Sequence, residues 1–133
     1  MIWSRVVLAA FVGGVVSSMT DWLFMGDWLY RRYDRHPEIW RSSERGETRA
    51  ILWASPLPFL TCVVFASTCA WLNLHSFAAT LIFALAVWLI GPLPLIVTNT
   101  IFVKMSPSIA TSHALGWLVK LEVAGLAVAL IAG

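Results

Sequence analysis

Four long apolar stretches make up most of this chain, over about residues 2–25, 48–72, 77–103 and 109–132. A helix needs about 20 apolar residues to cross a hydrocarbon core of about 30 Å. Hydrophobic residues are 59% of the 133 and charged residues 12%, whereas a typical soluble domain has about 45–50% and about 25%. The sequence therefore predicts an all-α fold, an integral membrane four-helix transmembrane bundle forming a single domain over 1–133.

The basic residues predict how the bundle is oriented. The polar stretch 26–47, together with Arg49, carries six arginines, and the third connection carries Lys104. The side with the two termini holds only Arg5. Because cytoplasmic loops of membrane proteins are enriched in Lys and Arg, we expect loops 1 and 3 in the cytoplasm and both termini outside, in a bacterial inner (cytoplasmic) membrane.

The sequence contains no motif typical of cofactor or nucleic-acid binding. The basic residues sit in one juxtamembrane loop with no soluble domain behind them, so we expect no nucleic-acid partner. His36, His75 and His113 are too scattered for one metal site, and no zinc, haem or nucleotide motif is present. Cys62 and Cys69 lie seven residues apart on an apolar helix, roughly 10 Å along its axis, which is too far for a disulfide. We interpret them as small packing residues and expect no metal and no cofactor.

Two similar proline motifs occur in the second and third stretches. They are Ser55-Pro56-Leu57-Pro58-Phe59 and Gly91-Pro92-Leu93-Pro94-Leu95. Proline removes a backbone donor and usually kinks a helix, and both motifs fall in the predicted cytoplasmic half. Two kinks at similar depth could splay the helices and open a cavity. Alternatively, the kinks are accommodated in a tight bundle, since membrane helices tolerate proline.

Four ionisable residues fall inside the apolar stretches: Arg5, Asp21, Lys120 and Glu122. Charged residues at the centre of a membrane helix cost about 2.5–3.5 kcal/mol on insertion scales, so we expect them to be paired or functional. The first and last helices are neighbours in a simple antiparallel bundle. This predicts a structural ion pair between Arg5 and Glu122 and a contact between Lys120 and Asp21.

Further polar residues lie near the Lys120–Asp21 contact. Asp21 shares a small-residue face with Gly14, Ser17 and Ser18, and small faces let membrane helices approach closely. The sequence predicts a small polar pocket in the cytoplasmic half, suited to an ion, a proton relay or a small ligand. The alternative is a set of structural hydrogen bonds and ion pairs. The predicted ligand-binding residues are Asp21, Thr98, Asn99, His113, Trp117 and Lys120.

Several features along the chain form one recognisable pattern. They are a Gly/Ala-rich segment from Val7 to Phe24, Trp28 and Trp40, and the motifs Thr98-Asn99-Thr100-Ile101-Phe102 and His113-Ala114-Leu115-Gly116-Trp117. This pattern resembles DUF1761, a family of small bacterial four-helix membrane proteins. The arginine-rich loop and the two proline motifs do not belong to the resemblance. It implies the four-helix membrane fold and no particular activity.

These observations favour a protein that binds or transports a small solute or ion. Because four helices enclose little volume, we expect a conducting path to form between protomers of a homo-oligomer. The alternative is a non-catalytic accessory or scaffold subunit of a larger membrane complex, with a membrane-protein partner beside the lipid bilayer. A lipid-modifying enzyme is less favoured, because we find no nucleophile–base pair and no metal-ligand spacing, and we predict no catalytic residue.

Overall fold

The computed structural model describes residues 3–27 and 44–133. Within them the protein is all-α, with four long apolar helices packed together, and the predicted fold class is confirmed. Most of the basic loop, with Trp28 and Trp40, lies outside the described residues. The four membrane spans agree with the predicted ranges to within two residues: Trp3–Phe24, Thr48–Trp71, Phe77–Phe102 and Pro107–Ala132.

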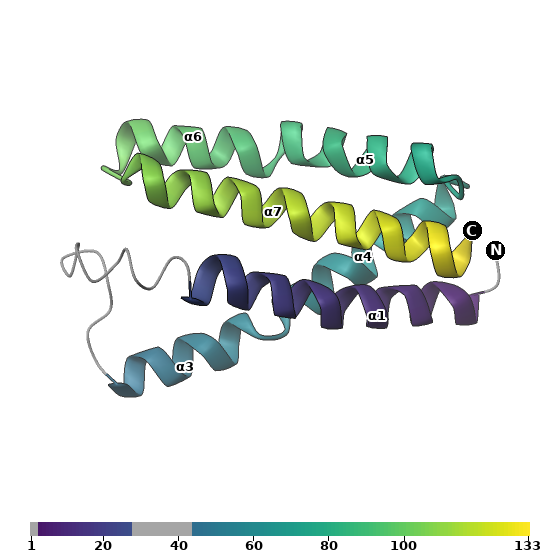
Figure 1. Ribbon diagram of the computed structural model, residues 1–133, viewed down its shortest axis with the longest axis horizontal. Coiled ribbons are helices and arrows are strands. Elements are labelled where there is room, and N and C mark those ends of the chain that lie inside the picture. Colours follow the sequence, from purple (N-terminus) through teal and green to yellow (C-terminus); the bar gives the residue numbers. More distant parts are fainter. Residues whose placement is uncertain (1–2, 28–43) are drawn as a thin grey trace.

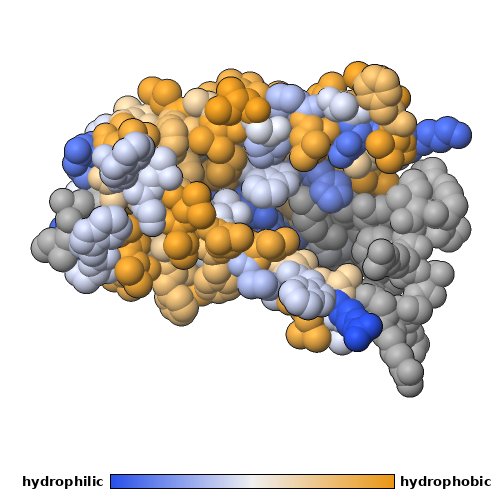
Figure 2. All heavy atoms as spheres, turned by 180° about the vertical axis from the view of Figure 1, so that it is seen from behind, coloured by the Kyte–Doolittle hydropathy of each residue, from blue (hydrophilic) through white to orange (hydrophobic). Residues whose placement is uncertain are grey.

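The chain is a multi-pass membrane protein whose two termini lie at the same end of the bundle (Figure 1). Its outer surface is largely hydrophobic, as lipid contact requires (Figure 2). The elements along the chain are α1 (Trp3–Asp21), the π-helical turn η1 (Trp22–Asp27), α3 (Glu44–Ala54), α4 (Leu57–Trp71), α5 (Phe77–Ile90), α6 (Pro92–Phe102), α7 (Pro107–Ala127) and the π-helical turn η2 (Val128–Ala132).

Both proline motifs interrupt their spans. The second span divides into α3 and α4 at Ser55 and Pro56, and the third divides into α5 and α6 at Gly91. Each proline lacks the N–H that the helical ladder needs. α3, which precedes the first break, diverges from the bundle (Figure 1), and residues 48–57 are all exposed.

Small residues set the distances between the helices. A Cβ built on Gly13 would lie 3.3 Å from the Ala127 Cβ, and one on Gly14 would lie 2.5 Å from the ring of Phe59. These contacts hold α1 against α7 and α4. Because α1 and α7 are antiparallel, the Gly13–Ala127 contact also fixes which residues of the two helices lie at the same depth.

The turn between α4 and α5 joins two helices that separate beyond it. Asn73 adopts a left-handed φ of 56°, which asparagine tolerates better than most residues. The Ser76 hydroxyl then accepts a hydrogen bond from the Ala79 N–H at 3.2 Å and caps α5. From this turn α4 packs mainly on α1, and α5 and α6 pack on α7. Space is therefore left between α4 and the α5–α6 pair.

Replacing Gly125 tests the close approach of α5 and α7. A Cβ on Gly125 would lie 3.2 Å from the Thr80 carbonyl oxygen, a backbone atom that cannot rotate away. We expect Gly125→Leu to lower the free energy of unfolding by about 1–3 kcal/mol through overpacking, and Gly125→Ala to lower it less. Thermal unfolding in detergent measures this, with Ala86→Leu, at an exposed position of α5, as the control. Equal melting temperatures for the two leucine variants would contradict the packing described.

Candidate functional site

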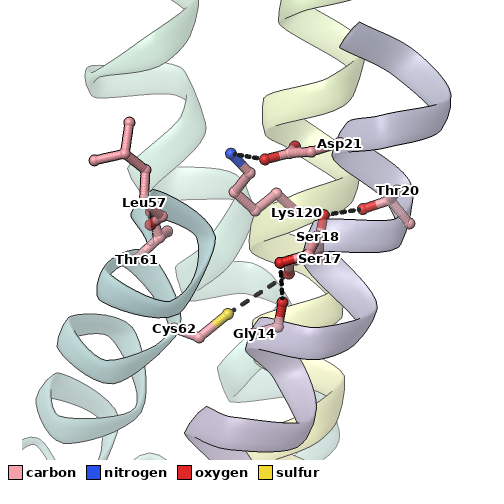
Figure 3. Close-up of polar contacts among 9 residues, drawn as sticks. All are labelled: Gly14, Ser17, Ser18, Thr20, Asp21, Leu57, Thr61, Cys62 and Lys120. Atoms are coloured by element: carbon pink, nitrogen blue, oxygen red, sulfur yellow. Dashed lines mark hydrogen bonds and ion pairs between the residues drawn. The ribbon is translucent and has the colours of Figure 1, made fainter. Parts of the chain in front are cut away.

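A buried ion pair joins the first and fourth spans. The Lys120 Nζ lies 2.6 Å from the Asp21 Oδ2, so the predicted contact is present in the structure (Figure 3). Lys120 is 5% exposed and lies thirteen residues from Pro107 and twelve from Ala132, in the middle of its span. Its ammonium also lies 4.3 Å from the centroid of the Trp117 ring, a favourable cation–π distance.

The small-residue face of α1 allows Lys120 to reach Asp21. Ser17, one turn before Asp21, is fully buried, and its hydroxyl is 3.5 Å from the Cys62 thiol of α4. Figure 3 shows the two polar contacts one above the other along α1. Sequence reasoning placed Ser17 on this face but did not foresee Cys62 as its partner. An apolar cysteine gives no signal of a polar contact until the helix register is known.

The second oxygen of the Asp21 carboxylate is unsatisfied. Oδ1 is buried and accepts no hydrogen bond from the residues that the structure describes. Buried polar atoms usually have a partner, because an unpaired one costs about 1–3 kcal/mol. His113, part-buried on α7, interacts electrostatically with both Asp21 and Lys120. The Asp21 Oδ1 can therefore accept a hydrogen bond from a donor outside the described residues.

An apolar cavity of about 440 Å³ adjoins the ion pair, within the range of small-molecule sites. It lies between α4 and the α5–α6 pair, and α7 forms its floor. Val64 and Leu95, both more than half exposed, belong to its rim, so it opens toward lipid. Figure 2 shows hydrophilic residues between the hydrophobic ones in the middle of this side of the bundle. The cavity is lined by Thr61, Val64, Phe65, Thr68, Phe83, Val87, Pro92, Leu95, Ile96, Trp117 and Leu121.

Trp117 connects the cavity to the ion pair. Its ring lines the cavity and also lies against the Lys120 ammonium. The hydroxyls of Thr61 and Thr68 donate to the carbonyls of Leu57 and Val64, so these threonines add little polarity to the wall. Pro92, from the second proline motif, is part of the lining. Of the two alternatives drawn from the proline motifs, this arrangement supports a cavity between the kinked helices and not a tight bundle.

The sequence predicted Thr98 and Asn99 beside the ion pair, but the structure does not place them there. Thr98 is exposed, since it lies on the side of α6 away from Ile96 and α7. Asn99 is part-buried but lies close to the turn that joins α6 to α7. Lys120 is thirteen residues into the last span, so roughly 15 Å of depth separates Asn99 from it at about 1.5 Å per residue. Of the predicted residues, Asp21, His113, Trp117 and Lys120 form one cluster.

The structure does not bring Arg5 and Glu122 together. Arg5 is exposed and Glu122 part-buried, and no ion pair joins them. The Gly13–Ala127 contact puts Glu122 at the level of Ser18, about 20 Å along the axis from Arg5 at about 1.5 Å per residue. Both side chains also tilt toward the start of their own helices, which points them further apart.

Known proteins give no further guide to the site. No family model, curated protein or solved structure matches the chain, so the resemblance to DUF1761 stays a prediction. In the described ranges, no three His, Cys, Asp or Glu side chains gather in a way that could hold a metal ion. The ligand-binding roles of the clustered residues also stay predictions.

Removing one member of the ion pair should destabilise the protein more than removing both. Lys120→Met would leave the Asp21 carboxylate buried without its partner, and breaking such a pair costs about 3–5 kcal/mol. The double variant Asp21→Leu/Lys120→Met removes both charges, so we expect it to recover most of this loss. Melting temperatures of the single and double variants in detergent test this. Additive losses in the double variant would show that the two residues act independently.

Proposed function

We propose that this protein binds or transports a small solute, and that its site combines the Asp21–Lys120 pair with the adjoining apolar cavity. The observation that carries the proposal is the double contact of Trp117, whose ring lines the cavity and lies against the Lys120 ammonium. A molecule in the cavity would lie against Trp117, and we propose that its polar end reaches the ion pair past this ring.

The charges favour a neutral solute over a free inorganic ion. Asp21 and Lys120 compensate each other at 2.6 Å, so the pair presents no net charge to hold an ion. The buried Asp21 Oδ1 accepts no hydrogen bond from the described residues and can accept one from a hydroxyl or an amide. We therefore propose a solute with an apolar body and a hydrogen-bond donor at one end.

The depth of the site suits a transport role. Lys120 is near the middle of its span, which is where membrane transporters commonly hold their substrates. The same geometry serves a protein that binds the solute without moving it.

Photolabelling tests the site directly. The probe is decanol carrying a diazirine on its chain, which combines a hydroxyl donor with an apolar body. In nanodiscs we expect the label to concentrate on cavity residues of α4 and α6 and to be displaced by excess decanol. Val87→Trp, which fills the cavity, should reduce this labelling at least tenfold. Asp21→Asn should raise the decanol concentration needed for displacement about tenfold, since a hydrogen bond to a charged group contributes about 1.5–3 kcal/mol.

The matched control is Val97→Trp on α6, because Val97 is 48% exposed and does not line the cavity. It should leave the labelling unchanged. Label spread evenly over all lipid-facing residues, or labelling unaffected by Val87→Trp, would remove the basis of the proposed function. An unchanged decanol concentration for displacement in Asp21→Asn would keep the cavity but exclude the ion pair from the site.

The role of an accessory or scaffold subunit stays the alternative prediction. It requires a reproducible companion when the protein is purified from native membranes in mild detergent. Purification of the chain without such a companion would count against that role.

A further inference from the structure

A second feature stands apart from the proposed site: Glu122 on the opposite side of α7. Glu122 follows Lys120 by two residues, which is about 200° around a helix. The buried stripe of α7 contains Gly116, Lys120 and Ala124, so the Glu122 carboxylate points away from the core. It is part-buried and makes no hydrogen bond or ion pair with any residue that the structure describes.

The depth of Glu122 makes this exposure costly. It lies fifteen residues from Pro107 and ten from Ala132, well inside the membrane span. Ionisable side chains at this depth almost always face a protein interior or a partner and not lipid. A carboxyl group here therefore needs a hydrogen-bonding partner that residues 3–27 and 44–133 do not supply.

The surroundings of Glu122 have the pattern of a helix–helix seam. Thr111, Leu115, Leu118 and Glu122 lie within about 60° of one another around α7 at about 100° per residue. Their spacings are four, three and four, as in the heptad spacing of coiled coils. Thr111 and Leu115 are exposed, and Leu118 and Glu122 are part-buried, so no described element fully covers this face. We name these four residues the outer stripe of α7.

We propose that the outer stripe of α7 is the interface of a homodimer, in which the Glu122 carboxyl groups of two copies hydrogen-bond to each other. A two-fold axis along the membrane normal places Glu122 of both chains at the same depth, because such interfaces are self-complementary. A protonated carboxyl donates through its O–H and accepts through its other oxygen, so it satisfies a second copy of itself.

The stripe favours a second copy over an unrelated partner. Its only ionisable residue is Glu122, so a different protein would need one matching polar group at the same depth within an otherwise apolar face. A second copy provides that group without further requirement. A single polar residue in an apolar seam is also the usual device that fixes register and oligomeric state.

Cysteine crosslinking in native membranes tests the proposal. Leu115→Cys, Leu118→Cys and Glu122→Cys should each give a crosslinked dimer on oxidation. The unaltered chain is the blank, because Cys62 and Cys69 are buried. Val15→Cys on α1 and Leu85→Cys on α5, at lipid-exposed positions, are the controls and should stay monomeric. No crosslink in the outer stripe, equal crosslinking at the controls, or a crosslink to a protein of different mass would overturn the proposal.

Energy transfer between labelled copies in liposomes separates the carboxyl contact from mere proximity. Glu122→Gln keeps a group that donates and accepts, so it should retain dimerisation. Glu122→Val removes both functions and should weaken dimerisation roughly threefold to tenfold, since interhelical hydrogen bonds in membranes contribute about 0.6–2 kcal/mol. Unchanged dimerisation in Glu122→Val would exclude the carboxyl pair as its cause.

Discussion

The buried pair of Asp21 and Lys120 depends on how closely three helices approach one another. An ammonium and a carboxylate at mid-membrane depth are tolerated only in contact, and the contact needs α1 to lie against α7 and α4. Gly13 and Gly14 permit that distance, because any larger side chain would meet Ala127 or Phe59. The glycines thus act on the site without touching it. The pair in turn ties the depth of the first span to that of the fourth.

The same packing accounts for the cavity. α4 is drawn toward α1, while α5 and α6 follow α7, although the turn at Asn73 joins α4 directly to α5. The interruption of the third span at Gly91 adds Pro92 to the wall. The cavity therefore lies between two well-packed helix pairs, α1 with α4 and α5 with α6, which both pack against α7.

Much of this could be predicted from the sequence, and the failures share one cause. Hydropathy gave the four spans within two residues, because bilayer thickness imposes a length on every span. Opposite charges suggested the Asp21–Lys120 contact. Thr98 and the Arg5–Glu122 pair were misplaced because hydropathy says nothing about rotation or relative depth. Those depend on particular contacts, such as that of Gly13 with Ala127, which are visible only once the helices are packed.

Under the proposed function, the exposed rim at Val64 and Leu95 would admit the solute from lipid and not directly from water. A molecule that enters through lipid has already partitioned from water, at about 0.8 kcal/mol per methylene, or roughly a fourfold enrichment for each. A weak affinity within the bilayer then suffices for occupancy. Contact with the apolar wall would add little binding free energy, because the solute would leave lipid chains of equal polarity to make it. Discrimination between solutes would consequently rest on the one carboxylate oxygen of Asp21, a single acceptor choosing among molecules that the membrane has already concentrated.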